Sequence, residues 1–355
     1  MLIVDAHLDL SLNALSWNRD LRKTVSEVRH SEAGLTDLAG RGNGTVTLPE
    51  MRRAGIGVCL ATQIGHCVSD NRLVPGWNSP ELAWAQTQGQ LAWYRAMEDV
   101  GEMRQLTRRS DLVRQVEALE RNDCAGPLGY VLSLEGADSL VTLTHLERAY
   151  AYGLRALGPA HYGPGRYAPG TGETGPLEPK GRELTRLMDE LGMAMDVTHL
   201  TDEGFFEAMD LFDGPVWASH SNCRSIVPGQ RQLSDEQIRM LVDRDAVIGA
   251  VFDAWMLFPD WERGETTPQS SGLKLAAIVE HVDHICQIAG SSRHCGIGSD
   301  LDGGFGSEQT PQDLNTISDL RKLVSLFEER GYDSEDIEGI MHGNWIRVLS
   351  RALPE

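Results

Sequence analysis

Eight short apolar runs, separated by helical stretches, constrain the fold of this 355-residue chain more than any other feature. Several runs are apolar along nearly their whole length, as strands buried on both faces of a parallel sheet are. An alternation of strand and helix repeated eight times predicts a (β/α)8 barrel, the TIM-barrel class of α/β fold. The runs are Leu2–Asp9, Val58–Gly65, Gly129–Gly136, Leu154–His161, Ala194–Leu200, Pro215–Ser221, Ala246–Asp253 and Cys295–Asp302.

Helical patterns fill the intervals between the runs. Two of them begin with residues that favour a helix N-terminus, Thr201-Asp202-Glu203 and Ser234-Asp235-Glu236. The helices we expect are Leu48–Ala54, Leu82–Met103, Gly181–Leu191, Asp202–Leu211 and Ser234–Asp243. The main alternative fold is an open doubly wound sheet, which often carries a glycine-rich phosphate loop after its first strand. Here the first run is followed by Leu10-Ser11-Leu12-Asn13, without glycine, which favours the barrel.

The length of the chain suggests about two domains, but barrels of this class commonly exceed ~250 residues as one domain. We therefore expect residues 1–355 to form a single barrel domain. Two stretches are longer than ordinary connections: residues 12–57, between the first two runs, and residues 258–272, after the seventh. Long loops on the functional face of a barrel often cover the substrate, although a mobile surface loop is the alternative interpretation.

Charge and composition exclude several classes of partner. The net charge is −20 and the pI is about 4.9, whereas binding to nucleic acid or to an anionic membrane needs a basic surface. No run approaches the ~20 apolar residues of a membrane-spanning helix. Because the first strand begins at Leu2, no room remains for a signal peptide, and we expect a cytoplasmic protein.

The cysteine pattern agrees with a reducing compartment. No C-x-x-C pair is present, so a thiolate zinc site is not expected, and we interpret all six cysteines as free thiols. They are Cys59, Cys67, Cys124, Cys223, Cys286 and Cys295, of which Cys59, Cys223 and Cys295 lie in or beside apolar runs.

Polar side chains with metal-binding groups stand at the ends of six of the eight runs. In a barrel all these ends meet at one mouth, where enzymes of this class keep their active sites. A lone histidine or acid at a strand end is more often structural than functional. A structural role for the whole set, however, would require independent coincidences at most of the strand ends, so a shared metal site is the better interpretation. The residues are His7 and Asp9, Glu135, His161, His199, His220, and Asp300 with Asp302.

The number of candidate ligands predicts two metal ions. Three histidines and two carboxylates exceed the need of one tetrahedral zinc that keeps a position open for water. If Glu135 bridges, His7 and Asp9 complete one site, and His199 and His220 complete the other. Two ions about 3.5–4 Å apart can share a hydroxide and polarise a carbonyl or phosphoryl oxygen.

These motifs together resemble those of the membrane (renal-type) dipeptidase family, peptidase family M19, a branch of the metal-dependent amidohydrolases. The resemblance covers nearly the whole chain in the right order and extends to a C-terminal helix that begins at Gly343-Asn344-Trp345. The motifs are Asp5-Ala6-His7-Leu8-Asp9, Ser133-Leu134-Glu135-Gly136, Asp196-Val197-Thr198-His199, Ser219-His220-Ser221 and Gly296-Ile297-Gly298-Ser299-Asp300-Leu301-Asp302-Gly303.

The resemblance implies roles for further residues. It implies two Zn²⁺ per chain with Glu135 as the bridging ligand, and His161 as the histidine that polarises the substrate. Asp300 matches the family's proton-handling acid, and Arg231 falls where the family places an arginine for the substrate's terminal carboxylate. We therefore expect His161 and Asp300 to be catalytic, and His161, Arg231 and Asp300 to contact the substrate.

Two neighbouring residues compete for these roles. His145 lies in a Leu-Thr-His sequence that relatives often carry at the substrate histidine, but it follows Glu135 too closely to end the next barrel strand. His161 is therefore preferred. Arg224 lies close to His220 in the sequence and competes with Arg231 for the carboxylate; we favour Arg231.

The function that this resemblance implies is a zinc-dependent metallo-dipeptidase that uses a metal-bridging hydroxide, with L-Xaa-D-Xaa dipeptides as expected substrates. Other divalent metals also suit such ligands, and family members are often homodimers. The alternatives are another hydrolase on this barrel (a lactonase, a deaminase or a phosphodiesterase) or a non-catalytic relative. We expect the ends of the second and seventh runs to shape the pocket, with ordinary loop packing as the alternative; the residues are Gln63, Gly65, His66, Asp253, Trp255 and Met256.

Overall fold

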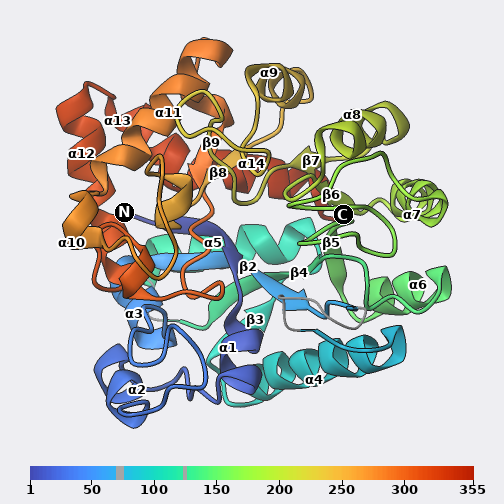
Figure 1. The fold of residues 1–355 in the computed structure, drawn as a ribbon, viewed down its shortest axis with the longest axis horizontal. Helices are drawn as coiled ribbons and strands as arrows, with labels where there is room; N and C mark the ends of the chain where they lie inside the picture. Colours follow the sequence, from blue (N-terminus) through green and yellow to red (C-terminus); the bar gives the residue numbers. More distant parts are fainter. Residues whose placement is uncertain (69–75, 123–125) are drawn as a thin grey trace.

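The computed structural model describes residues 1–68, 76–122 and 126–355, which form a parallel barrel surrounded by helices (Figure 1). The strands pair in the order β7-β6-β5-β4-β2-β1-β9-β8. A parallel bridge between Ala218 and Ile248 joins the two ends of this order and closes the barrel. The predicted (β/α)8 class is therefore confirmed.

Nine strands are present among the described residues. They are β1 (Ile3–Leu8), β2 (Ile56–Ile64), β3 (Met103–Gln105), β4 (Leu128–Glu135), β5 (Leu154–Gly158), β6 (Ala194–Asp196), β7 (Val216–Trp217), β8 (Ile248–Ala250) and β9 (Cys295–Ile297). Each of the eight predicted runs overlaps one of these strands, while β3 is an additional short strand that pairs with β4 outside the barrel order.

The α-helices of the described residues surround the barrel along its outside and at its ends. They are α1 (Leu10–Ser16), α2 (Val25–Ser31), α3 (Leu48–Ala54), α4 (Pro80–Asp99), α5 (Arg109–Asn122), α6 (Leu143–Ala151), α7 (Pro179–Glu190), α8 (Asp202–Leu211), α9 (Asp235–Asp243), α10 (Pro268–Ser271), α11 (Ala276–Ala289), α12 (Lys322–Arg330), α13 (Ser334–Glu338) and α14 (Asn344–Ala352). Short helical turns occur at Ala254–Met256, Ser292–His294, Ser307–Gln309, Ile317–Arg321 and Gly339–Gly343.

The predicted helix starts agree with the observed caps. Thr201 and Ser234 each accept a hydrogen bond from a backbone N–H of the first turn, as their position before α8 and α9 predicts. The predicted helix Leu82–Met103 is wrong at its C-terminal end, because α4 stops at Asp99 and Met103 begins β3. Gly101, with φ of 77°, turns the chain between them.

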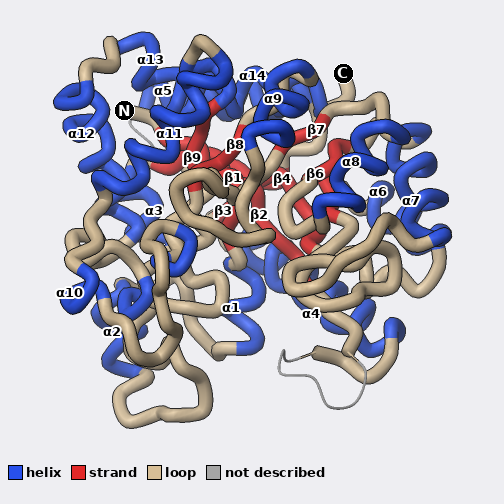
Figure 2. Tube along the Cα trace, turned by 45° about the horizontal axis from the view of Figure 1, so that its top comes forward, coloured by secondary structure: helices blue, strands red, loops and turns tan. Residues whose placement is uncertain are grey.

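The barrel interior is apolar and closed at its N-terminal end by α14. Trp345 of this helix packs edge-on against Trp217 of β7, and both are fully buried. A Cβ at Gly296 would lie 2.2 Å from the Trp345 indole nitrogen, so only glycine fits at this point of β9. The site must therefore lie at the opposite, C-terminal end of the strands, where long loops gather (Figure 2).

The long connection 12–57 is tied to the loop after β9 by a buried ion network. Arg19 Nη1 lies 3.2 Å from Asp302 Oδ2, and Arg19 Nε lies 2.8 Å from Glu32 Oε1. Asp302 Oδ1 also accepts a hydrogen bond from the Thr45 backbone N–H at 2.8 Å. Because these charges are paired and hydrogen-bonded inside the protein, they hold the connection against the mouth of the barrel.

The cysteines that the structure describes form no disulfide, as the prediction of free thiols expects. The free thiols are Cys59, Cys67, Cys223, Cys286 and Cys295, while Cys124 lies outside the described residues. Within the described ranges, the helices lack the combination of length and apolar character that a membrane crossing needs.

Candidate metal centre

The five predicted metal ligands come together at the C-terminal mouth of the barrel. Glu135 Oε1 lies 3.0 Å from His199 Nε2 and 3.3 Å from His220 Nε2. Its other oxygen, Oε2, lies 3.5 Å from His7 Nε2, and the carboxylate of Asp9 lies 3.9 Å from the same nitrogen. The Glu135 carboxylate therefore stands between the two halves of the cluster.

The strand ends and the loops after them place these side chains. His7 lies within β1 and Glu135 ends β4, whereas His199 and His220 follow the last residues of β6 and β7. His199 has a φ of 70°, in the left-handed region that non-glycine residues rarely adopt. Such backbone strain concentrates at functional sites, where the surrounding structure holds it in place.

Hydroxyl groups orient two of the histidines from behind. Thr171 Oγ1 lies 2.8 Å from His199 Nδ1, and Ser219 Oγ lies 2.8 Å from His220 Nδ1. With Nδ1 engaged in this way, each ring directs Nε2 toward Glu135. A hydrogen bond to the far nitrogen is the usual support of a metal-ligating histidine.

The cluster fits divalent metal ions. His7 Nε2 and Asp9 Oδ1 are buried without a hydrogen-bond partner, which is costly unless a ligand satisfies them. Three overlapping groups have ligand atoms within 4.8 Å of one another: His7 with Asp9 and Glu135, Glu135 with His199 and His220, and His7 with His220 and Asp300. Imidazole and carboxylate donors suit zinc and other first-row metals.

Burial and crowding perturb the acids of the cluster. Burial, together with the charge of Glu135, raises the pKa of Asp9 to about 7. Burial also raises the pKa of Asp300 well above its ordinary value, and the nearby Asp9 and Glu135 add to this effect. Bound cations would relieve the repulsion between these carboxylates.

The pKa values of His7 and His199 are shifted in opposite directions. Burial lowers the pKa of His7, but the carboxylates of Glu135, Asp9 and Asp300 outweigh it and raise that pKa to about 10. Burial lowers the pKa of His199 well below its ordinary value, and the charge of Arg231 adds to this effect. His199 is therefore neutral at pH 7, which is the form that binds a metal.

Asp300 and His161 lie beside the five ligands. Asp300 Oδ1 is 3.7 Å from His7 Nε2, and its backbone has a φ of 57°. The ring of His161 lies 4.7 Å from that of His199, and its buried Nδ1 has no hydrogen-bond partner. A Cβ at Gly136 would come within 3.2 Å of His161 Cβ, so glycine permits the close approach of these two loops.

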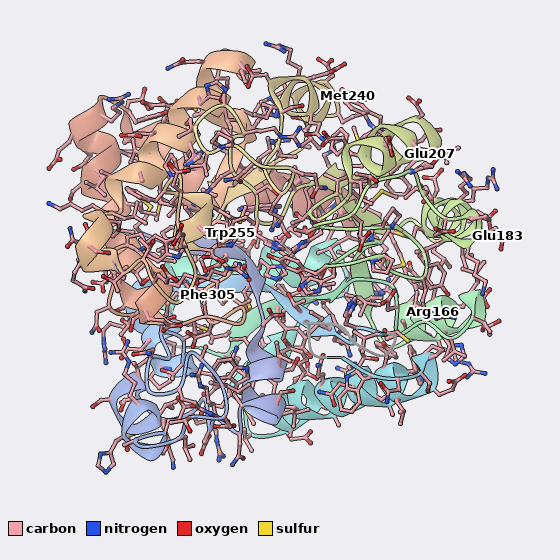
Figure 3. All side chains as sticks on the ribbon, in the orientation of Figure 1. Arg166, Glu183, Glu207, Met240, Trp255 and Phe305 are labelled. Atoms are coloured by element: carbon pink, nitrogen blue, oxygen red, sulfur yellow. The ribbon has the colours of Figure 1, made fainter. Side chains whose placement is uncertain are left out.

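A cavity of about 670 Å³ opens above the cluster. Its walls come from the loops after several strands, and Figure 3 labels Trp255 and Phe305, which line it from the loops after β8 and β9. The lining residues are Asp9, Ala39, Glu135, His161, Tyr162, His199, Arg231, Asp253, Trp255, Met256, Arg263, Gly264, Asp300, Gly303, Gly304, Phe305, Glu308 and Gln309. This volume suits a small organic substrate.

The two arginines proposed for the carboxylate differ in position. Arg231 is buried and lines the cavity, held by Nη1 to Ser221 Oγ and by Nη2 to the His220 carbonyl. Arg224 forms an ion pair with Asp202 at 2.7 Å and is not part of the cavity wall. The geometry favours Arg231 as the group that can meet a ligand.

His145 lies away from the cluster. It is the third residue of α6, where its ring nitrogen lies 3.0 Å from Thr142 Oγ1 at the helix N-terminus. His145 also packs edge-on against Trp84 and does not line the cavity.

Of the pocket-shaping residues expected at two strand ends, only those of the seventh run line the cavity, namely Asp253, Trp255 and Met256. At the second run Gln63, Gly65 and His66 do not line the cavity, although the His66 ring packs edge-on against that of His161. The Gln63 side chain binds the backbone of α4, a Cβ at Gly65 would meet the Ala83 carbonyl, and His66 pairs with Asp138.

Several residues of the site carry no motif that reveals them. Thr171 and Tyr162 stand in loops and have residue types that are common in any loop. Arg263 comes from the predicted loop 258–272, and the signal available for it was the length of that loop.

The chain resembles known proteins over its whole length. A family model described as membrane dipeptidase (peptidase family M19) matches residues 1–353. An uncharacterised protein of the pqqA 5′ region of Klebsiella pneumoniae is 32% identical over 212 residues, which cover 58% of this chain and 74% of that protein.

Two solved structures share the fold. The dipeptidase AC, a metallopeptidase of family M19, superposes with a TM-score of 0.79 at 24% identity, covering 100% of this chain and 99% of the other. A metallopeptidase from Rhodobacter sphaeroides, bound to a phosphinate mimic of the dipeptide L-Ala-D-Ala, superposes with a TM-score of 0.77 at 24% identity, covering 99% of each chain.

Proposed function

Because this chain belongs to the membrane dipeptidase family, peptidase family M19, and is a metallo-dipeptidase, we propose that it hydrolyses L-Xaa-D-Xaa dipeptides with two zinc ions at the barrel mouth. One observation carries the proposal: the Glu135 carboxylate lies within 3.0–3.5 Å of Nε2 of three histidines on three other loops or strands. A carboxylate in that position suits a bridging ligand between two cations.

The proposed ligand sets follow from this arrangement. Glu135 is shared, His7 and Asp9 complete one set, and His199 and His220 complete the other. When bound, the metal ions would lower the pKa of a water molecule and polarise the scissile carbonyl. The orphaned buried atoms His7 Nε2 and Asp9 Oδ1 support this assignment, since both need a ligand.

The other residues of the site act on the substrate and its protons. Arg231 binds the terminal carboxylate through its guanidinium group, whose planar fork matches a carboxylate. His161 donates to the carbonyl oxygen as negative charge develops there. Asp300, with its raised pKa, accepts a proton from the attacking water and delivers it to the leaving amine.

The preference for dipeptides would come from Arg231. A carboxylate clamped at this point of the cavity requires the substrate to end one residue past the bond that is cut. The phosphinate complex of the Rhodobacter sphaeroides protein supports an L,D configuration, since that ligand mimics L-Ala-D-Ala. The homodimer and the cytoplasmic location expected from the sequence stay predictions.

A panel of dipeptides of both chiralities, assayed with the zinc-loaded protein, tests this proposal. We expect hydrolysis of L-Xaa-D-Xaa dipeptides that stops on chelation of the metal and returns when zinc is restored. Lactones and phosphotriesters belong in the same panel as alternative substrates. Activity toward those compounds with none toward any dipeptide would replace the proposal with another hydrolase of this barrel class.

A further inference from the structure

The cavity contains a second arginine, Arg263, on the wall formed by the loop 258–272. Its guanidinium lies 4.9 Å from the ring centroid of Trp255, and Nη2 lies 3.4 Å from Asp253 Oδ2. Its side chain is 53% exposed, in contrast to the buried Asp253. The guanidinium of Arg263 therefore contacts the Trp255 ring and the Asp253 carboxylate, and it remains accessible from the cavity.

Of the two acids in this part of the wall, Asp253 has both of its oxygens engaged. Asp253 Oδ1 accepts hydrogen bonds from Gln309 Nε2 at 2.7 Å and from the Trp255 backbone, while Oδ2 faces Arg263. Glu308 Oε1 accepts from the Gly306 N–H at 2.9 Å, whereas its buried Oε2 has no hydrogen-bond partner among the described residues. Asp253, the acid beside Arg263, therefore offers no free oxygen to a cationic substrate group.

Arg231 and Arg263 each have N–H donors that make no hydrogen bond within the described part of the protein. A guanidinium carries five N–H donors. Arg231 uses two of its nitrogens for Ser221 and His220, and Arg263 donates to Asp253 through Nη2. Both arginines of the cavity wall therefore keep N–H donors that a negatively charged substrate group can use.

Arg231 and Arg263 line the same cavity of about 670 Å³, and Tyr162 lies in its wall with them. A substrate that fills this cavity is therefore exposed to both guanidinium groups.

We propose that Arg263 binds a second carboxylate of the substrate, so that the enzyme prefers dipeptides whose C-terminal residue is aspartate or glutamate. The inference rests on the proposed function, in which Arg231 binds the α-carboxylate of that residue. The side-chain carboxylate of the same residue then reaches Arg263. A planar guanidinium stacked on Trp255 is preorganised for such a contact, because little side-chain freedom is lost on binding.

Paired substrates test the charge alone. L-Ala-D-Glu and L-Ala-D-Gln have nearly the same shape and differ by one negative charge. With the zinc-loaded wild type we expect kcat/KM to be at least about tenfold higher for L-Ala-D-Glu, which corresponds to about 1.4 kcal/mol. The L,L pair provides the same comparison if the enzyme accepts that configuration.

The variant Arg263→Met keeps an unbranched apolar stem but removes the guanidinium group and its charge. We expect the ratio of kcat/KM for L-Ala-D-Glu to that for L-Ala-D-Gln to fall to about one, because KM for L-Ala-D-Glu rises. For L-Ala-D-Gln we expect kcat/KM to stay within about twofold of wild type. Arg22→Met is the matched control, because Arg22 is an exposed arginine paired with Asp20 outside this cavity. This control loses the same overall charge and should keep the wild-type ratio.

The outcomes separate this inference from the proposed function. A wild type that cleaves both substrates equally, or an Arg263→Met variant that keeps the preference, overturns the role of Arg263. A preference that appears instead for L-Glu-D-Ala over L-Gln-D-Ala overturns the assignment to the C-terminal residue. If no dipeptide is cleaved, the proposed function fails and this inference fails with it.

Discussion

Glu135 Oε1 lies 3.0 Å from Nε2 of His199, although Glu135 ends β4 and His199 lies in the loop after β6. The opposite oxygen of the same carboxylate faces His7. One side chain thus contacts both halves of the candidate metal centre, and its removal should affect both halves together.

Replacing Glu135 with alanine should reduce bound metal below that of wild type. The variant leaves His7, His199 and His220 without their common carboxylate, so we expect zinc affinity to fall at least about tenfold, as loss of a direct ligand should exceed the loss of its outer hydrogen bonds. Elemental analysis after dialysis measures the zinc content. Two full equivalents per chain in this variant would rule out a bridging role.

Asp300→Asn should separate proton transfer from metal binding. The amide cannot accept the proton, so we expect two bound zinc ions and a kcat lowered by about 10²–10⁴-fold. Because Asp300 also belongs to a group with His7 and His220 that could hold a metal, zinc content must be measured alongside turnover. Turnover near that of wild type would remove Asp300 from the mechanism, whereas loss of one zinc would make it a ligand.

Arg231→Met should raise KM for dipeptides by about 10–100-fold, since the guanidinium contact with a carboxylate is lost. Arg224→Met is the matched comparison, because Arg224 pairs with Asp202 and does not line the cavity. Steady-state kinetics of the two variants decide between them. A larger KM effect in Arg224→Met would transfer the carboxylate role to that residue.

The metal-free protein should lose stability as the pH rises from about 7 to 10. His7 has an ordinary pKa of 6.5 that folding raises to about 10, so the folded state binds an additional proton in this window. Its stabilising contribution is complete below pH 6.5 and is lost as the pH passes through the folded value. Each pKa unit corresponds to about 1.4 kcal/mol, so the effect should be large enough to measure.

Urea unfolding of the chelated protein between pH 7 and 10 checks this expectation. Zinc should abolish the His7 contribution to the slope, because a metal ligand histidine is neutral throughout. His7→Gln in the metal-free state should flatten the slope in the same way. A metal-free wild type whose unfolding free energy is constant over this range would contradict the assigned charge on His7.

Much of the barrel was predictable because its signals are local. An apolar run with a polar terminus, as in His7 and Glu135, identifies both a buried strand and a residue at its end. Thr201 and Ser234 marked two helix starts, since N-caps depend only on neighbouring residues. The barrel geometry then brings such ends together without further information.

The lengths of the strands were less accessible from sequence. β7 covers only Val216–Trp217, and His220 stands beyond it in a loop that continues the apolar pattern. Hydrophobicity reports burial, and a loop packed inside the barrel mouth is as buried as a strand. The left-handed backbone of His199 had no local signal either, because tertiary contacts impose it.

The supporting residues were not predictable for a related reason. Thr171 reaches His199, and Gln309 reaches Asp253, across long separations in the sequence. Serine, threonine and glutamine are common in all loops, so their types reveal nothing until the fold brings them to a ligand. Arg263 is similar, since only its position above the metal cluster distinguishes it from other exposed arginines.

A zinc titration of the metal-free protein, followed by hydrolysis of L-Ala-D-Ala, tests the central claim most directly. If His7, Asp9, Glu135, His199 and His220 hold two catalytic ions, activity should rise with added zinc and reach its plateau at two equivalents per chain. Full activity at one equivalent, full activity of the chelated protein, or no cleavage at two equivalents would contradict the account.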